Sequence, residues 1–287
     1  MILKKIKLSL VLTFILLVSA YGESLSVMHW NISNAFDTVK DPKKNDTVMT
    51  TEKYNDKMSI TAGIIKRYAP DIVTLCEVEN INVLGDLAAR CGYEYFYLIE
   101  GNDPRGIDVA IMSVYEMNYK SNKDMPTPYP GNPRYKFSRD CVTGQFKTPS
   151  GKNFCIMTTH LKSSFRDDGK SEMKRNAQAK GMLTVIDTIY KEEKNEPFLI
   201  ITGDLNTNRY SSTLQILEKA GLKILNYKEK QNDFYTYIYK NEKQDLDYII
   251  VNQKLEKAMK HPKLRTINNK IISGASDHYP IILEFDL

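Results

Sequence analysis

Short apolar runs recur along the chain, each bounded by polar residues, glycine or proline. Runs of this length predict β-strands, because a strand covered on both faces presents apolar side chains on each side. The predicted strands cover residues 26–31, 71–76, 93–99, 107–114, 198–202, 234–239, 246–251 and 281–285. Residues 137–146 and 153–159 are predicted to form a hairpin around Pro149-Ser150-Gly151.

Between these strands, longer segments space their apolar residues every three or four positions, the period of an α-helix. Helices are predicted at residues 54–68, 80–90, 168–191 and 212–220. Residues 37–53 and 120–134 are polar or rich in proline, asparagine and glycine, and are expected to be loops. Strands outnumber helices, and two packed sheets with helices outside would bury this much apolar strand. The pattern therefore predicts a mixed α/β (α+β) domain.

The N-terminus has the pattern of a secretory signal peptide. Three lysines precede an apolar run at residues 8–18, and Val18-Ser19-Ala20 fits the small-residue rule for cleavage after Ala20. The apolar run is short for a membrane span of about 20 residues. We expect a signal peptide at 1–20, a mature domain at 21–287 without a membrane span, and a secreted or periplasmic location.

Composition and charge narrow the class of protein. The chain has 287 residues, of which 42% are hydrophobic and 26% charged, values that exclude disordered, collagen-like and polytopic membrane proteins. Its net charge is +5, from 40 basic and 35 acidic residues. Removing the three lysines of residues 1–20 leaves 37 basic residues and a net charge of +2. The mature chain therefore lacks a global basic signature of nucleic-acid binding.

Four cysteines remain in the predicted mature chain: Cys76, Cys91, Cys141 and Cys155. In an exported protein they could form disulfides, in any of three pairings, or stay as buried thiols. Their separations do not indicate a zinc cluster.

Polar side chains follow the ends of several predicted strands. Asp204 and Asn206 are two residues apart, so in an extended chain they point the same way. A carboxylate beside a buried strand is costly unless it is paired, hydrogen-bonded or bound to metal. Oxygen donors of this kind suit Mg²⁺, Mn²⁺ or Ca²⁺. The candidate oxygen ligands are Asn31, Glu77, Asp204, Asn206 and Asp277.

Two histidines lie at comparable positions. His160 and His278 could transfer protons, and each would need a carboxylate to fix its tautomer. Asp108 and Asp247 are available for this. Taken singly, each such residue could be a turn, cap or surface residue. That is how His29 and His261 are interpreted, and Arg105 and Arg139 by themselves are ordinary solvated charges.

The ordered set of motifs resembles the endonuclease/exonuclease/phosphatase superfamily, in a form typical of exported bacterial members related to deoxyribonuclease I. The resemblance runs from about residue 26 to residue 287. It is carried by Asn31, Glu77, Arg105-Gly106-Ile107-Asp108, Phe137-Ser138-Arg139, Thr159-His160-Leu161, Gly203-Asp204-Leu205-Asn206, Leu246-Asp247-Tyr248 and Ser276-Asp277-His278. It implies a four-layered α/β sandwich, with two mixed sheets face to face and helices outside.

The resemblance also implies metal-dependent hydrolysis of a phosphoester by in-line attack of water. Asn31, Glu77 and Asp277 would hold the metal, Mg²⁺ or else Mn²⁺ or Ca²⁺. The implied catalytic residues are Asp204 and Asn206, which orient the water, His278 held by Asp247, and His160 held by Asp108. Arg105 or Arg139, with Asn206, would bind phosphate oxygens. The acid and base labels of the two histidines stay interchangeable at this point.

The substrate is the least constrained part of this interpretation. An endonuclease acting on DNA, or on RNA, is favoured because deoxyribonuclease-like members carry a histidine at the position of His160. A sphingomyelinase or a phosphoinositide phosphatase of the same fold is the alternative, and a non-catalytic binding protein is a remote one. No stable protein partner is inferred, and a monomer is expected.

Overall fold

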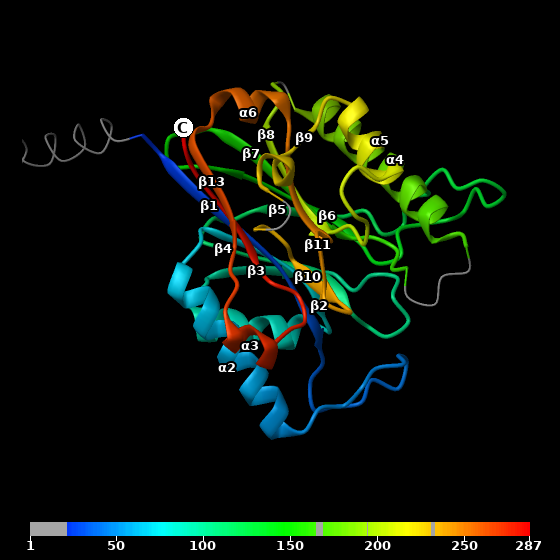
Figure 1. The fold of residues 1–287 in the computed structure, drawn as a ribbon, viewed down its shortest axis with the longest axis vertical. Helices are drawn as coiled ribbons and strands as arrows, with labels where there is room; N and C mark the ends of the chain where they lie inside the picture. Colours follow the sequence, from blue (N-terminus) through cyan, green and yellow to red (C-terminus); the bar gives the residue numbers. More distant parts are fainter. Residues whose placement is uncertain (1–21, 165–168, 194, 231–232) are drawn as a thin grey trace, which may run out of the picture.

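Two six-stranded β-sheets face each other in the computed structural model (Figure 1). The structure describes residues 22–164, 169–193, 195–230 and 233–287, so the predicted signal peptide lies outside the described residues. Within them, no helix combines the length and the apolar character needed to cross a membrane.

The first sheet has the order β13-β14-β1-β2-β4-β3. Its β1–β2 pair is parallel and its other pairs are antiparallel, so the sheet is mixed. The strands are β1 (Ser24–Ala35), β2 (Ile72–Val78), β3 (Tyr95–Leu98), β4 (Asp108–Ser113), β13 (Lys260–Thr266) and β14 (Ile281–Asp286).

The second sheet has the order β5-β6-β7-β8-β12-β9, with β7 and β8 parallel. Its strands are β5 (Asn118–Ser121), β6 (Cys141–Lys147), β7 (Asn153–His160), β8 (Phe198–Asp204), β9 (Lys223–Ile224) and β12 (Asp247–Val251). A separate two-stranded hairpin joins β10 (Tyr237–Tyr239) and β11 (Glu242–Gln244).

Helices cover the outer faces of both sheets (Figure 1). The first sheet packs against α2 (Thr51–Tyr68) and α3 (Ile81–Cys91), and the second against α4 (Ser171–Glu192) and α5 (Ser212–Lys219). A short helix, α6 (Gln253–Ala258), and two 3₁₀ turns, η1 (Leu225–Lys228) and η2 (Lys270–Gly274), complete the elements. One apolar cluster fills the space between the sheets and one lies under each helical layer. The predicted four-layered sandwich is confirmed.

The element boundaries differ from the sequence prediction where local signals are weak. Helix α2 begins at Thr51, three residues early, because the Thr50 side chain caps its N-terminus. The expected loop at 120–134 loses its first residues to β5, and β6 begins at residue 141 rather than 137. The first residue of the predicted helix 168–191 lies outside the described residues, and β10 is shorter than the predicted strand 234–239.

Strand β13 was not predicted, because its sequence Lys-His-Pro-Lys-Leu-Arg-Thr has almost no apolar residues. It is the outermost strand of the first sheet and most of its residues are exposed. Lysines and proline are typical of such edges, where they discourage pairing with another chain. The four cysteines are all free thiols, and three of them are buried.

Candidate active site

Three neighbouring strands of the second sheet place the predicted polar residues side by side. In the pairing register His160 of β7 lies opposite Asp204 of β8, and Asp204 lies opposite Asp247 of β12. Gly203 makes this close approach possible, because a Cβ atom there would lie 2.3 Å from the backbone oxygen of Thr159. The register thus brings residues from three distant parts of the chain to one edge of the sheet.

The facing sheet contributes Asn31 from β1 and Glu77 from β2. Glu77 occupies a bulge in β2 with a φ of +66°, a conformation that is strained for a residue with a side chain. Its two carboxylate oxygens accept hydrogen bonds from the backbone N of Asn34 at 2.8 Å and from Nδ2 of Asn31 at 3.3 Å. These two hydrogen bonds fix the orientation of the Glu77 carboxylate.

Asp204 lies at the centre of the site and is almost completely buried. Its Oδ2 accepts a hydrogen bond from Nδ2 of Asn31 at 2.9 Å, and its Oδ1 accepts one from the backbone N of Asn206 at 2.9 Å. Nε2 of His160 is 3.3 Å and Nε2 of His278 is 3.9 Å from the same Oδ2. Burial, and then the nearby Asp247 carboxylate, raise the pKa of Asp204 to about 7.

His278 and Asp247 form the pair expected from the sequence. Nδ1 of His278 lies 2.7 Å from Oδ2 of Asp247. Burial disfavours the charged imidazole, but the Asp247 carboxylate outweighs this effect and raises the pKa of His278 to about 10. Burial also opposes the charge of Asp247, yet His278 keeps the pKa of this carboxyl below its usual range. His278 therefore carries a positive charge at neutral pH.

A further histidine lies behind this pair and was not expected in the site. Nε2 of His29, which is fully buried on β1, lies 3.3 Å from Oδ1 of Asp247. Its Nδ1 lies 2.9 Å from Oγ1 of Thr74, which in turn accepts a hydrogen bond from Thr202 of the second sheet at 2.8 Å. The sequence signal was its spacing, since His29 and Asn31 are two residues apart and share one face of a strand. His261, by contrast, is exposed on β13.

The expected pairing of Asp108 with His160 is not observed. Oδ1 of Asp108 accepts a hydrogen bond from the backbone N of Gly101 at 2.7 Å. Its Oδ2, and Nδ1 of His160, have no hydrogen-bond partner within the described part of the chain. Burial raises the pKa of Asp108 to about 7, and burial followed by the Arg139 charge lowers the pKa of His160 well below its usual value. The Gly101 loop thus engages Asp108, and His160 faces Asp204 instead.

Two arginines share one carboxylate at the rim. Nε of Arg139 lies 2.8 Å from Asp103, and its Nη1 donates to the backbone oxygen of Leu161 at 3.1 Å. Arg139 is buried, and its contact with Leu161 supports the end of β7. Arg105 also pairs with Asp103, at 3.2 Å, but is 40% exposed, and its Nη1 donates to Oδ1 of Asn34 at 3.3 Å. Of the two, Arg105 is the guanidinium that lies at the open rim.

Two of the predicted metal ligands, Asn31 and Glu77, contact each other beside Asp204. Asn31 is buried, Glu77 is half-buried, and Asp277 is exposed ahead of β14. Carboxylate oxygens are donors that Mg²⁺, Mn²⁺ and Ca²⁺ prefer, so Glu77 and Asp277 fit such a cation. Asn31 turns its Nδ2 toward Glu77 and Asp204, and its Oδ1 accepts a hydrogen bond from the backbone N of Ser33 at 2.9 Å. Lys57 of α2 donates to the backbone oxygen of Ala275. Burial lowers the pKa of Lys57 to about 8, against the opposing effect of Glu77 and Asp277.

A second group of donors comprises Asp204, Asp247 and His278, whose ligand atoms lie within 4.8 Å of one another. The hydrogen bond between His278 and Asp247 already uses one atom of each and has a proton between them. This group is therefore better suited to moving protons than to holding a metal.

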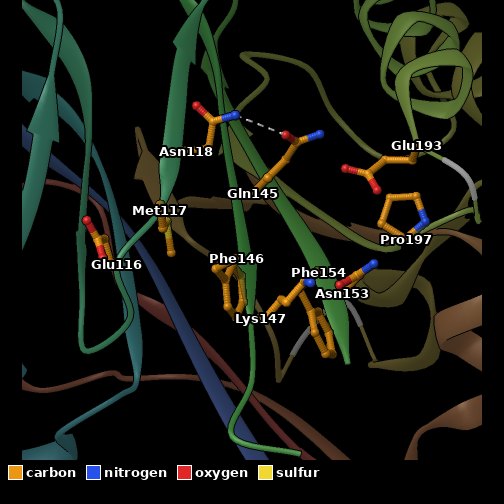
Figure 2. A pocket seen from close by; sticks show the side chains of 10 residues that line it. All are labelled: Glu116, Met117, Asn118, Gln145, Phe146, Lys147, Asn153, Phe154, Glu193 and Pro197. Atoms are coloured by element: carbon orange, nitrogen blue, oxygen red, sulfur yellow. Dashed lines mark hydrogen bonds between the residues drawn. The ribbon is translucent and has the colours of Figure 1, made fainter. Parts of the chain in front are cut away.

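A cavity of about 610 Å³ lies elsewhere, at the opposite end of β7 from His160. Figure 2 shows its polar walls, including the hydrogen bond between Asn118 and Gln145, above the rings of Phe146 and Phe154. None of the predicted catalytic, metal-binding or phosphate-binding residues lines this cavity.

Comparison with known proteins identifies the family and the fold. Residues 26–262 match a family described as the Endonuclease/Exonuclease/phosphatase family. A search of curated protein sequences finds no match.

Solved structures resemble the whole fold. The catalytic domain of human Nocturnin with a bound sulfate anion is similar at a TM-score of 0.66 and 20% identity, over 92% of this chain and 94% of that chain. Truncated Caenorhabditis elegans TDP2 is similar at a TM-score of 0.64 and 16% identity, over 92% of this chain and 98% of that chain. D. rerio TDP2 complexed with a single-strand DNA product is similar at a TM-score of 0.63 and 19% identity, over 92% of this chain and 100% of that chain. By its sequence match and its fold, the chain belongs to the endonuclease/exonuclease/phosphatase family, whose members hydrolyse phosphoric esters.

Proposed function

We propose that this protein is a metal-dependent phosphodiesterase, and specifically an endonuclease that cleaves DNA, with RNA as a further substrate. The observation that carries the proposal is the convergence of two imidazoles on one buried carboxylate. Nε2 of His160 and Nε2 of His278 lie 3.3 and 3.9 Å from Oδ2 of Asp204. Such a cluster can activate water and stabilise charge on a phosphate between the two sheets.

Asn31, Glu77 and Asp277 would hold the divalent cation in this mechanism. When bound, such an ion would place positive charge beside the phosphate and stabilise the negative charge that develops on it. Asn206, whose Nδ2 donates to the backbone oxygen of Leu161 at 3.2 Å, would orient a phosphate oxygen with its second amide hydrogen. Arg105 at the rim offers a forked pair of donors for the remaining oxygens.

The protonation states assign distinct roles to the acid and base groups. A general base works best when its pKa is near the working pH, and the pKa of Asp204 is about 7. Asp204 therefore suits removal of a proton from the attacking water. His278, charged and held by Asp247, suits stabilisation of the phosphate and protonation of the leaving oxygen. His160 is neutral, and its Nε2–H can orient the Asp204 carboxylate.

Nucleic acid as substrate is supported by the nature of the similar structures. D. rerio TDP2 is complexed with single-strand DNA product, and its fold covers 92% of this chain. The test is to incubate the protein with supercoiled plasmid DNA and Mg²⁺, with EDTA and the His160→Ala variant as controls. The proposal is supported if the wild-type protein nicks the plasmid and nicking is absent both with EDTA and with the His160→Ala variant. Intact plasmid, together with hydrolysis of sphingomyelin or a phosphoinositide, would replace it with a lipid-directed phosphoesterase.

We also propose that the protein is exported and acts as a monomer after cleavage following Ala20. The small-residue pattern Val18-Ser19-Ala20 supports the cleavage position. Mass spectrometry of the protein from the culture medium or periplasm should give an N-terminus at Tyr21. Light scattering after size exclusion should give the mass of one chain, and a dimer mass would contradict the monomer.

A further inference from the structure

A buried arginine lies behind the active site, on the loop that follows Asp204. This loop leads from β8 to α5 (Figure 1). Two of its residues, Asn206 and Tyr210, have left-handed backbone conformations, with φ values of +50° and +62°. A left-handed conformation is unfavourable for tyrosine in particular, so contacts with other parts of the fold must hold the loop in this shape.

Arg209 of this loop makes contacts with two other segments. Its Nε donates to Oδ2 of Asp245 at 2.6 Å, and its Nη1 donates to the backbone oxygen of Glu229 at 2.7 Å. The arginine side chain is 5% exposed, and the aspartate side chain is fully buried. The centre of the guanidinium lies 6.0 Å from the centre of the Phe234 ring. Arg209 therefore joins the loop after β8 to the residues before β12 and after η1.

The segments that Arg209 joins also carry groups of the active site. Asn206 lies three residues before Arg209, on the same loop. Asp247 lies two residues after Asp245, and its Oδ2 is 2.7 Å from Nδ1 of His278. The ion pair therefore links the residue that would orient a phosphate oxygen to the carboxylate that holds the charged imidazole.

Other contacts hold the first part of the loop. The backbone N of Leu205 donates to the backbone oxygen of Leu246 at 2.8 Å. The hydroxyl of Tyr248 lies 2.9 Å from the backbone oxygen of Thr207. These contacts reach residues 205–207, whereas Arg209 ties the second part of the loop to the segment that leads into β12.

The ion pair offers direction rather than stability. Taking two charges out of water offsets most of their attraction, and an apolar pair of similar volume is often equally stable. Oδ1 of Asp245 and Nη2 of Arg209 have no hydrogen-bond partner among the residues that the structure describes. Burial raises the pKa of Asp245 to about 6, although Arg209 opposes this effect. What the guanidinium adds over an apolar side chain is a rigid fork of donors, which fixes the two segments at one distance and angle.

We propose that Arg209 is a positioning residue, which through its ion pair with Asp245 holds Asn206 and Asp247 in the geometry that phosphoester hydrolysis needs. The proposal rests on the proposed function and deepens it. Arg209 acts through Asp245 and not by contact with the substrate. A displacement of about 1 Å in a catalytic group can lower the rate about 10²-fold, so a small shift of either segment is enough to affect the reaction.

A double substitution separates positioning from stability. Arg209→Met/Asp245→Leu replaces the ion pair by an apolar pair, so the melting temperature should stay close to that of the wild type. With bis-p-nitrophenyl phosphate and Mg²⁺, kcat should fall about 10- to 100-fold while KM changes less than about 2-fold. Arg209→Lys keeps the charge but not the fork, and it should lose less kcat than the double variant.

The matched control removes an ion pair that lies far from the loop. Arg265→Met/Glu284→Leu replaces an exposed pair between β13 and β14, whose nitrogen and oxygen are 3.0 Å apart. This control should change neither kcat nor KM, because exposed pairs fix little geometry.

Hydrogen–deuterium exchange tests the positioning without any catalysis. In the double variant, the amides of residues 205–210 and 245–247 should exchange faster than in the wild type, whereas those of β1 and β2 should not change.

Unchanged kcat in the folded double variant would overturn the proposal and leave the pair with a structural role only. Equal exchange rates in the two segments, or a change in KM alone, would do the same. If the double variant does not fold, wild-type kcat in Arg209→Lys would overturn the proposal, and a lowered kcat at constant KM would support it. If the wild type hydrolyses no phosphodiester but exchange quickens as expected, the proposed function fails and the hold of Arg209 on the two segments is supported.

Discussion

Replacing Asp204 with asparagine is expected to stabilise the protein while removing its activity. The carboxylate is almost fully buried in the wild type, and its pKa rises from 3.8 in a model peptide to about 7 in the fold. The folded state therefore favours the protonated form. As pH rises from about 4 to about 7, the Asp204 carboxyl ionises in the unfolded chain but stays protonated in the fold, so the free energy of unfolding falls progressively. Above pH 7 both states are ionised and the penalty is complete.

The size of this penalty follows from the shift. About three pKa units correspond to roughly 4 kcal/mol of unfolding free energy at pH 8. Asparagine keeps an acceptor for the backbone N of Asn206 but puts an amide NH2 group in place of Oδ2, which faces both Asn31 and His160, and losing these two contacts costs about 1 kcal/mol each. The net expectation at pH 8 is a gain of about 2–3 kcal/mol for Asp204→Asn. At pH 5 most of the gain should disappear, because the wild-type carboxyl is then protonated.

Urea unfolding in EDTA at pH 5 and pH 8 measures this difference directly. The matched control is Asp187→Asn, on an exposed position of α4, which should show no gain at either pH. If Asp204→Asn were less stable than the wild type at pH 8, or if its advantage were the same at both pH values, a buried, ionised Asp204 could not be the source of strain. The reasoning about its role as a base near neutral pH would then fail as well.

Four more predictions test other parts of the site. His278→Ala should lower the hydrolysis rate about 10² to 10⁴-fold with an unchanged far-UV spectrum, and near-normal turnover would contradict its role. Mg²⁺ at 100 times its dissociation constant should stabilise the wild type by about 2.7 kcal/mol in thermal unfolding, and Glu77→Gln should lose this effect. Gly203→Ala should lower the melting temperature sharply, because its Cβ would lie 2.3 Å from a backbone oxygen of β7. His29→Leu should lower kcat by a larger factor than it changes KM, because Asp247 loses the contact that positions it. His29→Gln keeps a hydrogen-bond donor and should recover part of the lost kcat.

Much of the chemistry was visible in the sequence because it depends on residues that follow strands. Gly203-Asp204-Leu205-Asn206 and Ser276-Asp277-His278 are local motifs, and polar residues after apolar runs stand out whatever the fold around them. The resemblance to the family also implied the contact between His278 and Asp247, whereas the need of an imidazole for a carboxylate left both Asp108 and Asp247 as partners. The family and the two-sheet architecture came from the same information.

The sequence could not determine contacts that depend on how the two sheets face each other. His29 was interpreted as an ordinary histidine, because its neighbour Asp247 belongs to the opposite sheet. Asp108 was expected to hold His160, but the Gly101 backbone binds it instead. The protonation states belong in the same category, because burial sets them and burial is a property of the packed sheets.

The tyrosines show this division most clearly. In the sequence, Tyr237 and Tyr239 are two of 18 tyrosines scattered along the chain and carry no signal of their own. The fold places Tyr237 beside His278, because Thr236 and Tyr279 join the hairpin to the catalytic edge of the sheets. The sequence determined which chemical groups follow each strand, because this depends only on the local order of residues. Only the tertiary structure decided which of them meet, because the partners come from strands that register and sheet packing bring together.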